Sequence, residues 1–243
     1  MKSDVSRDWL HTTGFTAGID TMMKLAMRRL GVGGACVYLA MAAGGCALAG
    51  LIGRALPGPT IAPKYTNLKK QTVAVMVWTD RGVAIEQPNL QYELAAMIQQ
   101  KLLDAQQKDK PKELEGMKFP WSAESVLRFQ RDHPDTEEQA IADVAPRLGV
   151  SRLIYIEVEY FQTRPSDSLE LFRGSISATL KVLEIRDGKA TVAYEESNIR
   201  DVYPPKSPEE GVPNKGELWA YEGTVDEFTT DVAHRFVPYQ QEE

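Results

Sequence analysis

The chain has 243 residues, with 28 lysines and arginines against 34 aspartates and glutamates and a formal net charge of −6 at pH 7. This acidic balance argues against nucleic acid as a partner, because nucleic-acid-binding proteins carry basic patches. It also argues against an electrostatic hold on anionic lipid. Beyond the first 45 residues the chain is long enough for one domain with a substantial core.

Residues 28–46 have the pattern of an export signal. Two arginines precede an uncharged, mostly apolar run at 32–41, and small residues then lead to Cys46. A basic region, a short apolar run and a small-residue cleavage site are the three parts of a secretory signal. The stretch resembles a bacterial lipoprotein signal, with Ala43 where that family usually has leucine. The resemblance implies that the preceding peptide is removed and that Cys46 is acylated.

Two alternatives to a cleaved lipoprotein stay open. Residues 31–53 carry no charge, and a membrane span needs about 20 apolar residues, so an uncleaved signal anchor is the second interpretation. Cleavage at a different site is the third. The start is Met1 or Met27, since a start at Met27 gives a signal of ordinary length. In each case the basic flank stays inside and the following chain lies outside the cytoplasmic membrane.

Cysteine usage agrees with a lipid anchor. Cys36 lies in the apolar run, so Cys46 is the only thiol expected in the processed chain, which excludes an internal disulfide and a cysteine-based metal site there. A single acyl chain holds a protein only marginally to a membrane. The lipoprotein resemblance implies several acyl chains on Cys46, and these supply the expected membrane contact.

We expect four parts along the chain. Residues 54–71 contain three prolines, which favour extended backbone and a semi-stiff spacer. The expected parts are an N-terminal extension and signal peptide at 1–45, a lipidated N-terminus with a proline-rich tether at 46–71, a single α/β domain at 72–237 and a polar tail at 238–243.

The first half of the domain alternates apolar runs with helical patterns. The near-continuous apolar run 72–78 predicts a strand buried on both faces. Helical spacing of apolar residues follows Pro88 and Asn89, and the charged stretch 105–116 predicts a loop. The other elements expected here are a short strand at 117–119, a helix at 122–129 capped by Ser122, and a helix that begins with a capping pattern at 135–138, is distorted by Pro146 and ends at Gly149.

The second half predicts a sheet with one polar face. Along 169–185 apolar residues alternate with arginine, serine, threonine and lysine, which indicates a strand with one wet or partner-covered side. Asp187 and Gly188 form a strong hairpin-turn signal. The expected elements are strands at 153–161, 169–185 and 190–197, a mobile loop at 203–217 with four prolines, and a closing helix at 224–236.

This order of elements predicts a fold of the broad α/β class, arranged as an α+β sandwich in which helices pack against a sheet. We expect a mixed, largely antiparallel sheet of about four or five strands, with about three or four helices packed on one face. The runs 72–77 and 148–158 resemble a group of bacterial envelope lipoprotein domains: the curli-secretion lipoprotein, the penicillin-binding-protein activator lipoproteins and the N-terminal domain of the Tol-Pal propeller protein. Residues 77–80 replace that group's aromatic–x–Asn, and no pore-forming insertion is apparent. The resemblance implies fold and compartment more than activity.

No catalytic constellation stands out in the sequence. The three histidines, His11, His133 and His234, are far apart and in unlike settings, and no hydrolase or nucleotide-binding motif occurs. We therefore expect no metal site and no cofactor. Glu157 and Glu159 project from the same face of their strand, where paired carboxylates either form an ordinary salt-bridged surface or cleave glycosides.

A partner or ligand surface is expected at Trp78, Asp80, Arg81 and Arg173. The first three lie at the carboxyl end of a central strand, where α/β sheets tend to bind ligands, and Arg173 lies on the polar sheet face. The alternative interpretation is a tryptophan that closes the core beside a solvated turn.

Together these features predict a lipid-anchored, extracytoplasmic protein of the cell envelope. We expect that it is not an enzyme and that it binds or helps to assemble another envelope protein. An auxiliary subunit of an envelope transport or export complex is the first alternative. A hydrolase that uses Glu157 and Glu159 is the second.

Overall fold

The computed structural model describes residues 59–240 except 138, 166, 167 and 169. Cys46, the export stretch and both candidate start residues lie outside the described residues, as does the first part of the expected tether. No helix within the described range has the length and the hydropathy of a membrane span.

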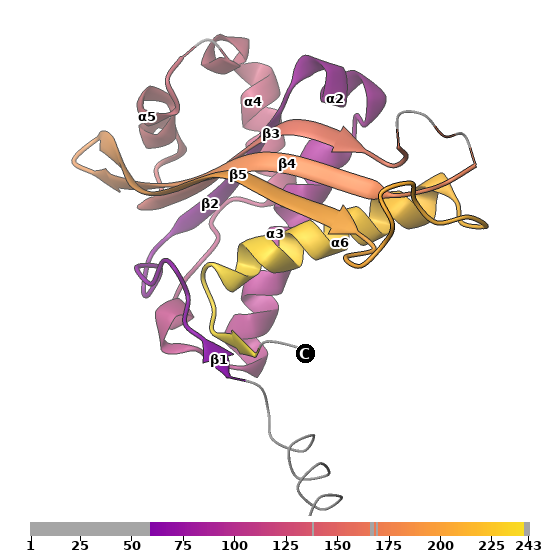
Figure 1. The fold of residues 1–243 in the computed structure, drawn as a ribbon. Coiled ribbons are helices and arrows are strands. Elements are labelled where there is room, and N and C mark those ends of the chain that lie inside the picture. The colour runs from indigo at the N-terminus through magenta and orange to yellow at the C-terminus, as the bar shows by residue number, and fades with distance from the viewer. Residues whose placement is uncertain (1–58, 138, 166–167, 169, 241–243) are drawn as a thin grey trace, which may run out of the picture. The chain divides into compact units, whose positions relative to one another are not determined.

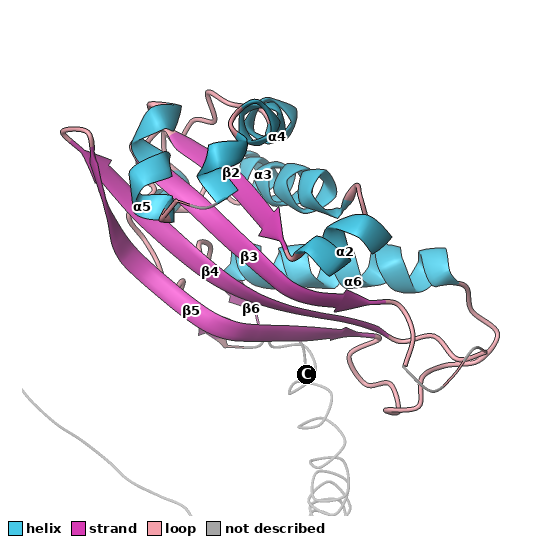
Figure 2. Cartoon of the chain, turned by 90° about the horizontal axis from the view of Figure 1, so that it is seen from above, coloured by secondary structure: helices cyan, strands magenta, loops and turns pink. Residues whose placement is uncertain are grey.

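A mixed four-stranded sheet in the order β2–β3–β4–β5 organises the domain (Figure 1 and Figure 2). β2 and β3 are parallel, whereas β3–β4 and β4–β5 are antiparallel pairs. The predicted α/β class with a mixed, largely antiparallel sheet is confirmed. The strands are β2 (Val73–Thr79), β3 (Arg152–Gln162), β4 (Gly174–Arg186) and β5 (Lys189–Tyr203).

Helices cover both faces of this sheet (Figure 1), rather than the one face that the sequence predicts. α3 and α6 pack on the first face, whereas α4, α5 and η3 pack on the second. The apolar run of β2 needs cover on both sides, because Val75 faces the first layer and Met76 the second. The helices are α2 (Arg81–Glu86), α3 (Leu90–Lys108), α4 (Ala123–Asp132), α5 (Ile141–Val144) and α6 (Glu217–His234), with 3₁₀ turns η1 (Lys112–Leu114), η2 (Pro134–Glu137) and η3 (Ala145–Leu148).

The first face carries the main hydrophobic core. α3 presents apolar residues at the predicted helical spacing, and α6 presents the predicted inward stripe. Fully burying one such side chain contributes about 1.5–3 kcal/mol, so these two helices stabilise the sheet strongly. The fully buried residues include Leu90, Leu94, Ile98 and Leu102 of α3, and Phe228, Val232 and the following Phe236.

β4 and α6 approach each other closely at Gly174. A Cβ atom at this position would lie 1.6 Å from Thr224 Oγ1 and 2.8 Å from the carbonyl oxygen of Ala220. Glycine at the first residue of β4 is therefore a packing requirement of the first face.

The segment 59–71 belongs to the domain, although the sequence predicts a tether there. β1 (Thr60–Ile61) pairs with β6 (Tyr239–Gln240), so the expected polar tail also contributes a strand. Tyr65 and Leu68 are buried in the main core. These two apolar side chains stand among lysines and polar residues, which is why composition alone does not reveal their burial.

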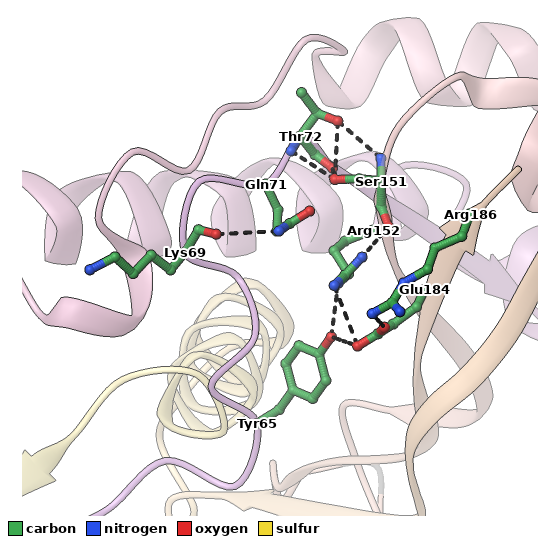
Figure 3. Close-up of polar contacts among 8 residues, drawn as sticks. All are labelled: Tyr65, Lys69, Gln71, Thr72, Ser151, Arg152, Glu184 and Arg186. Atoms are coloured by element: carbon green, nitrogen blue, oxygen red, sulfur yellow. Dashed lines mark hydrogen bonds and ion pairs between the residues drawn. The ribbon is translucent and has the colours of Figure 1, made fainter.

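A buried ionic network fixes this segment to the sheet (Figure 3). Arg152, which is 6% exposed, donates from Nε to the Tyr65 hydroxyl at 3.1 Å and from Nη1 to the carbonyl of Ser151 at 2.7 Å. Its Nη2 lies 3.4 Å from Oε1 of Glu184, which also accepts from the Tyr65 hydroxyl at 3.2 Å. Burial above all raises the pKa of Tyr65 to about 12, so the hydroxyl remains a donor at neutral pH.

The helix predicted from residue 135 is broken. η2 forms there instead, and α5 is short before η3 begins. Pro146 lies at the start of η3, where it lacks the N–H that a continuing α-helix needs. Gly149 ends η3 in the left-handed conformation with φ of 62°, as predicted.

Two further local predictions are confirmed. Ser122 caps α4, and its Oγ accepts from the Ser125 N–H at 3.2 Å. Asp187 and Gly188 form the turn between β4 and β5, with φ of 51° and 73°. Positive φ at both central residues matches the twist of a tight hairpin.

Both segments predicted as loops make tertiary contacts that their composition does not indicate. α3 extends into the first of them, 105–116, where Gln106 Nε2 donates to the carbonyl of Met117 at 3.1 Å. The second, 203–217, is held by a bridge between Phe172 and Val212. Contacts of this kind join distant segments and leave no local signal.

Candidate functional site

A cleft of about 360 Å³ lies on the second face of the sheet, between the strands and the layer formed by α4, η2 and α5. The strands contribute its floor and the helical layer most of its wall. From the floor it is lined by Met76, Trp78, Tyr155, Glu157 and Lys181. From the wall it is lined by residues that include Gln91, Gln130, Arg131, Thr136, Gln139 and Ile141.

Strand register brings the floor together. Trp78 of β2 lies opposite Glu157 of β3, and Tyr155 of β3 lies opposite Lys181 of β4. Residues two apart on a strand share a face, so Met76 projects to the same side as Trp78. Two aromatic rings, a carboxylate and an ammonium group therefore share one surface.

Side-chain hydrogen bonds hold α4 beside this floor. Gln130 Nε2 donates to the carbonyl of Val77 at 3.0 Å. Trp121 Nε1, just before α4, donates to the carbonyl of Leu148 at 2.9 Å and ties the helix to η3. The wall of the cleft is thus attached both to β2 and to the neighbouring 3₁₀ turn.

Several polar groups of the cleft are available to a ligand. Within residues 59–240 as described, the side chains of Trp78, Gln91 and Glu157 make no hydrogen bond or ion pair with another residue. Lys181 Nζ lies 3.5 Å from Oε1 of the exposed Glu195. Burial first, and then the charge of Glu157, raise the pKa of Tyr155, so this phenol is neutral.

Beyond α4 and α5, none of the helices that the structure describes covers the second face (Figure 2). β3, β4 and β5 run past the helical layer. Residues of these three strands surround a shallow hollow of about 460 Å³. The register of β3 on β4 shifts between Val158 and Tyr160 in this region, and Tyr160 is 44% exposed. The polar residues around the hollow are Glu159, Tyr160, Ser175, Ser177 and Arg200.

The residues predicted as one surface have different roles. Trp78 lines the cleft. Asp80 caps α2, with its Oδ1 accepting from the Gly82 N–H at 2.8 Å, and Arg81 is the exposed first residue of that helix. Arg173 lies just before β4 begins, whereas the cleft residue Lys181 lies in the second half of that strand. The structure therefore joins Trp78 with Glu157 and Lys181, and it separates Arg173 from them.

Glu157 and Glu159 have different surroundings. Glu157 lines the cleft, whereas Glu159 lies beside the open hollow and accepts from Thr179 Oγ1 at 2.9 Å. In the described part of the chain neither carboxylate forms an ion pair, and Lys181 pairs with Glu195 instead. The salt-bridged pair that cross-strand spacing suggests is thus replaced by one cleft carboxylate and one surface carboxylate.

The histidines in the described range pack on aromatic rings. His133 lies 4.5 Å from Phe129 between ring centroids, and His234 stacks on Tyr239 at 3.9 Å. No group of three or more metal-ligating side chains occurs among the residues that the structure describes.

Most residues that line the wall of the cleft could not be predicted from the sequence. Tyr155 could have been found, because it shares the face of Glu157 two residues along a predicted strand. Gln91, Arg131 and Gln139 come from α3, α4 and the turn before α5. Their convergence on Trp78 depends on tertiary packing, which no local pattern encodes.

Comparison with known proteins gives similarities among solved structures only. No family model matches the chain, and no curated protein matches it. The hypothetical protein CT253 from Chlamydia trachomatis is 18% identical, over 68% of this chain and 98% of that chain, with a TM-score of 0.37. The lipoprotein GNA1162 from Neisseria meningitidis is 14% identical, over 67% and 96%, with a TM-score of 0.36. The PelC dodecamer from Paraburkholderia phytofirmans is 9% identical, over 75% and 94%, with a TM-score of 0.33.

Proposed function

We propose that this chain is a lipid-anchored, extracytoplasmic protein of the bacterial cell envelope, fastened through Cys46. Its domain binds another envelope protein and catalyses no reaction. The export stretch at 28–46 supports the location. The open part of the second sheet face supports the binding role.

The observation that carries this proposal is the uncovered hollow beside β3, β4 and β5. The opposite face of these strands is packed under α6, whereas this part presents Tyr160, Arg200 and two serines to solvent. Tyrosine and arginine are enriched at the energetic centres of protein interfaces. The serines add small hydrogen-bonding groups that let a partner approach the sheet.

Site-specific cross-linking tests the proposal. The sequence has no cysteine after Cys46, so Ser177→Cys in the full chain places a single new thiol in the hollow. A maleimide–benzophenone reagent on this thiol should give one discrete protein adduct in intact envelopes. The added substitution Tyr160→Ala should reduce that adduct at least about tenfold, the effect of losing 1.4 kcal/mol.

The matched control is Glu222→Cys, which places the thiol on an exposed position of α6. It should give no such adduct. Equal adducts from both positions, or an adduct from Ser177→Cys that Tyr160→Ala leaves unchanged, would contradict the proposal. An adduct of fixed stoichiometry with a transporter subunit would assign the narrower role of an auxiliary subunit in a transport or export complex.

The hydrolase alternative makes a separate prediction about Glu157 and Glu159. Under our proposal the purified protein has no glycosidase activity, so the double substitution Glu157→Gln and Glu159→Gln has no such activity to remove. A glycosidase activity of purified protein that this double variant abolishes would establish the alternative instead.

A further inference from the structure

The cleft at Trp78 has the dimensions of a small-molecule site. Its volume of about 360 Å³ lies at the lower end of the 300–1,000 Å³ typical of ligand pockets. It is bounded by the sheet below and by α4 and α5 at the side. A compact ligand therefore suits it better than an extended polypeptide.

The floor and wall combine aromatic and aliphatic surface. Trp78 and Tyr155 rise from neighbouring strands, and Met76 and Ile141 add aliphatic contact. Tryptophan has a large apolar body and one N–H donor at its edge. A ligand with a flat apolar face and polar edges matches this arrangement.

The polar lining contains both donors and acceptors. Glu157 only accepts, Lys181 and Arg131 only donate, and Gln91 does both. A cationic ligand would use acceptors alone, and an anionic ligand would use donors alone. Hydroxyl groups donate and accept at once, so a polyhydroxylated ligand can satisfy all of these side chains.

We propose that this cleft binds a neutral saccharide of one or two rings. The apolar face of a sugar ring stacks on Trp78, while its hydroxyls donate to Glu157 and accept from Arg131, Lys181 and the amide of Gln91. Planar carboxylate, guanidinium and amide groups suit adjacent hydroxyls, because each offers two hydrogen-bonding atoms side by side. The proposal does not depend on the protein partner proposed for the open hollow.

The test uses purified full-length protein and saturation-transfer NMR with glucose, galactose, mannose, N-acetylglucosamine and the β-1,4-linked disaccharides of glucose and N-acetylglucosamine. At least one of these should bind saturably. Trp78→Ala should weaken that binding at least about tenfold, and Glu157→Gln about threefold to tenfold. Trp78→Phe keeps an aromatic face and should weaken it by only about threefold, which separates loss of the platform from misfolding.

Tyr160→Ala is the matched control, since it removes an aromatic ring of the same sheet face outside the cleft. It should leave saccharide binding unchanged even where it reduces the cross-link described above. The proposal is overturned if none of the saccharides binds saturably, or if Trp78→Ala binds as well as the unsubstituted chain. It is also overturned if tetramethylammonium, as a probe for a cation over the indole, binds at Trp78 and the saccharides do not.

Discussion

At the scale of single residues, Asp201 carries a partly buried carboxyl group with a raised pKa. It lies on β5 opposite Ile176, and its Oδ2 is buried without a hydrogen-bond partner in the described part of the chain. Burial is the main reason that its pKa rises to about 7, and the charges of Asp231 and Glu227 add to this. Arg235 opposes the rise but does not cancel it.

This raised pKa predicts a pH dependence of stability. The folded state holds the Asp201 proton more tightly than the unfolded state, whose pKa is near 3.8, so its stabilising contribution is complete below pH 4 and is lost as pH rises toward 7. Asp201→Asn removes the ionisation. We expect its melting temperature to exceed that of the unsubstituted chain at pH 8 by about 2–4 °C or more, and the difference to shrink by pH 5.

Scanning calorimetry at pH 5 and pH 8 measures this difference. Glu222→Gln is the control, because it makes the same acid-to-amide change at an exposed position of α6. A difference for Asp201→Asn that is independent of pH, or that is larger at pH 5, would show that this carboxyl does not titrate as described.

The Arg152–Glu184 pair gives a second prediction at the residue scale. Glu184→Gln leaves the buried guanidinium without its carboxylate and should lower the free energy of unfolding by about 3–5 kcal/mol. Glu195→Gln removes a more exposed ion-pair partner of Lys181 and should cost less than about 1 kcal/mol. Urea unfolding of the two variants compares them. Equal small losses would mean that the network does not hold the N-terminal segment to the sheet.

At the scale of elements, the packing of α6 on β4 depends on the absence of a side chain at Gly174. Gly174→Ala would force its Cβ against Thr224 and the backbone of Ala220, so we expect a loss of about 3 kcal/mol or more in the free energy of unfolding. The control is Gly216→Ala, where no atom lies within 4 Å of the added Cβ. That change alters only the N-cap of α6 and should cost less than about 1 kcal/mol.

Chemical denaturation measures both glycine variants. Similar stabilities for Gly174→Ala and Gly216→Ala would show that α6 can move away from β4 at little cost. The first face would then be less tightly packed than its fully buried core indicates.

Elements with strong local patterns could be predicted from the sequence. The spacing of Leu90, Leu94 and Ile98 gave the buried face of α3, and Asp187-Gly188 gave the hairpin turn. The prediction that helices pack on one face of the sheet was wrong, since they cover both faces. The apolar run 72–78, predicted to be buried on both sides, already implied this. The continuous helix predicted from residue 135 was also wrong, because η2 forms there and Pro146 limits α5 to one turn.

At the scale of the whole chain, the sequence predicts the export stretch and the order of elements, and the structure adds the cleft and the domain boundary. The sequence locates Trp78 at the carboxyl end of a strand that we expected to be central. The structure places this strand, β2, at the edge of the four-stranded sheet and adds the cleft around Trp78. The structure also extends the domain back to Pro59, which shortens the expected tether. Segments such as 59–71 are held by burial of Tyr65 and by the ionic network, and both involve residues far away in the sequence.

The proposed location and role both depend on export of the chain and its attachment to the membrane through Cys46. Mass spectrometry of the N-terminal peptide from membrane-purified protein tests this most directly. We predict a peptide that begins at Cys46 and carries the mass of its acyl chains, and we predict that Cys46→Ala is neither acylated nor processed. A membrane-free chain that retains residues 28–45 and carries no fatty acid would contradict the location and the role proposed here.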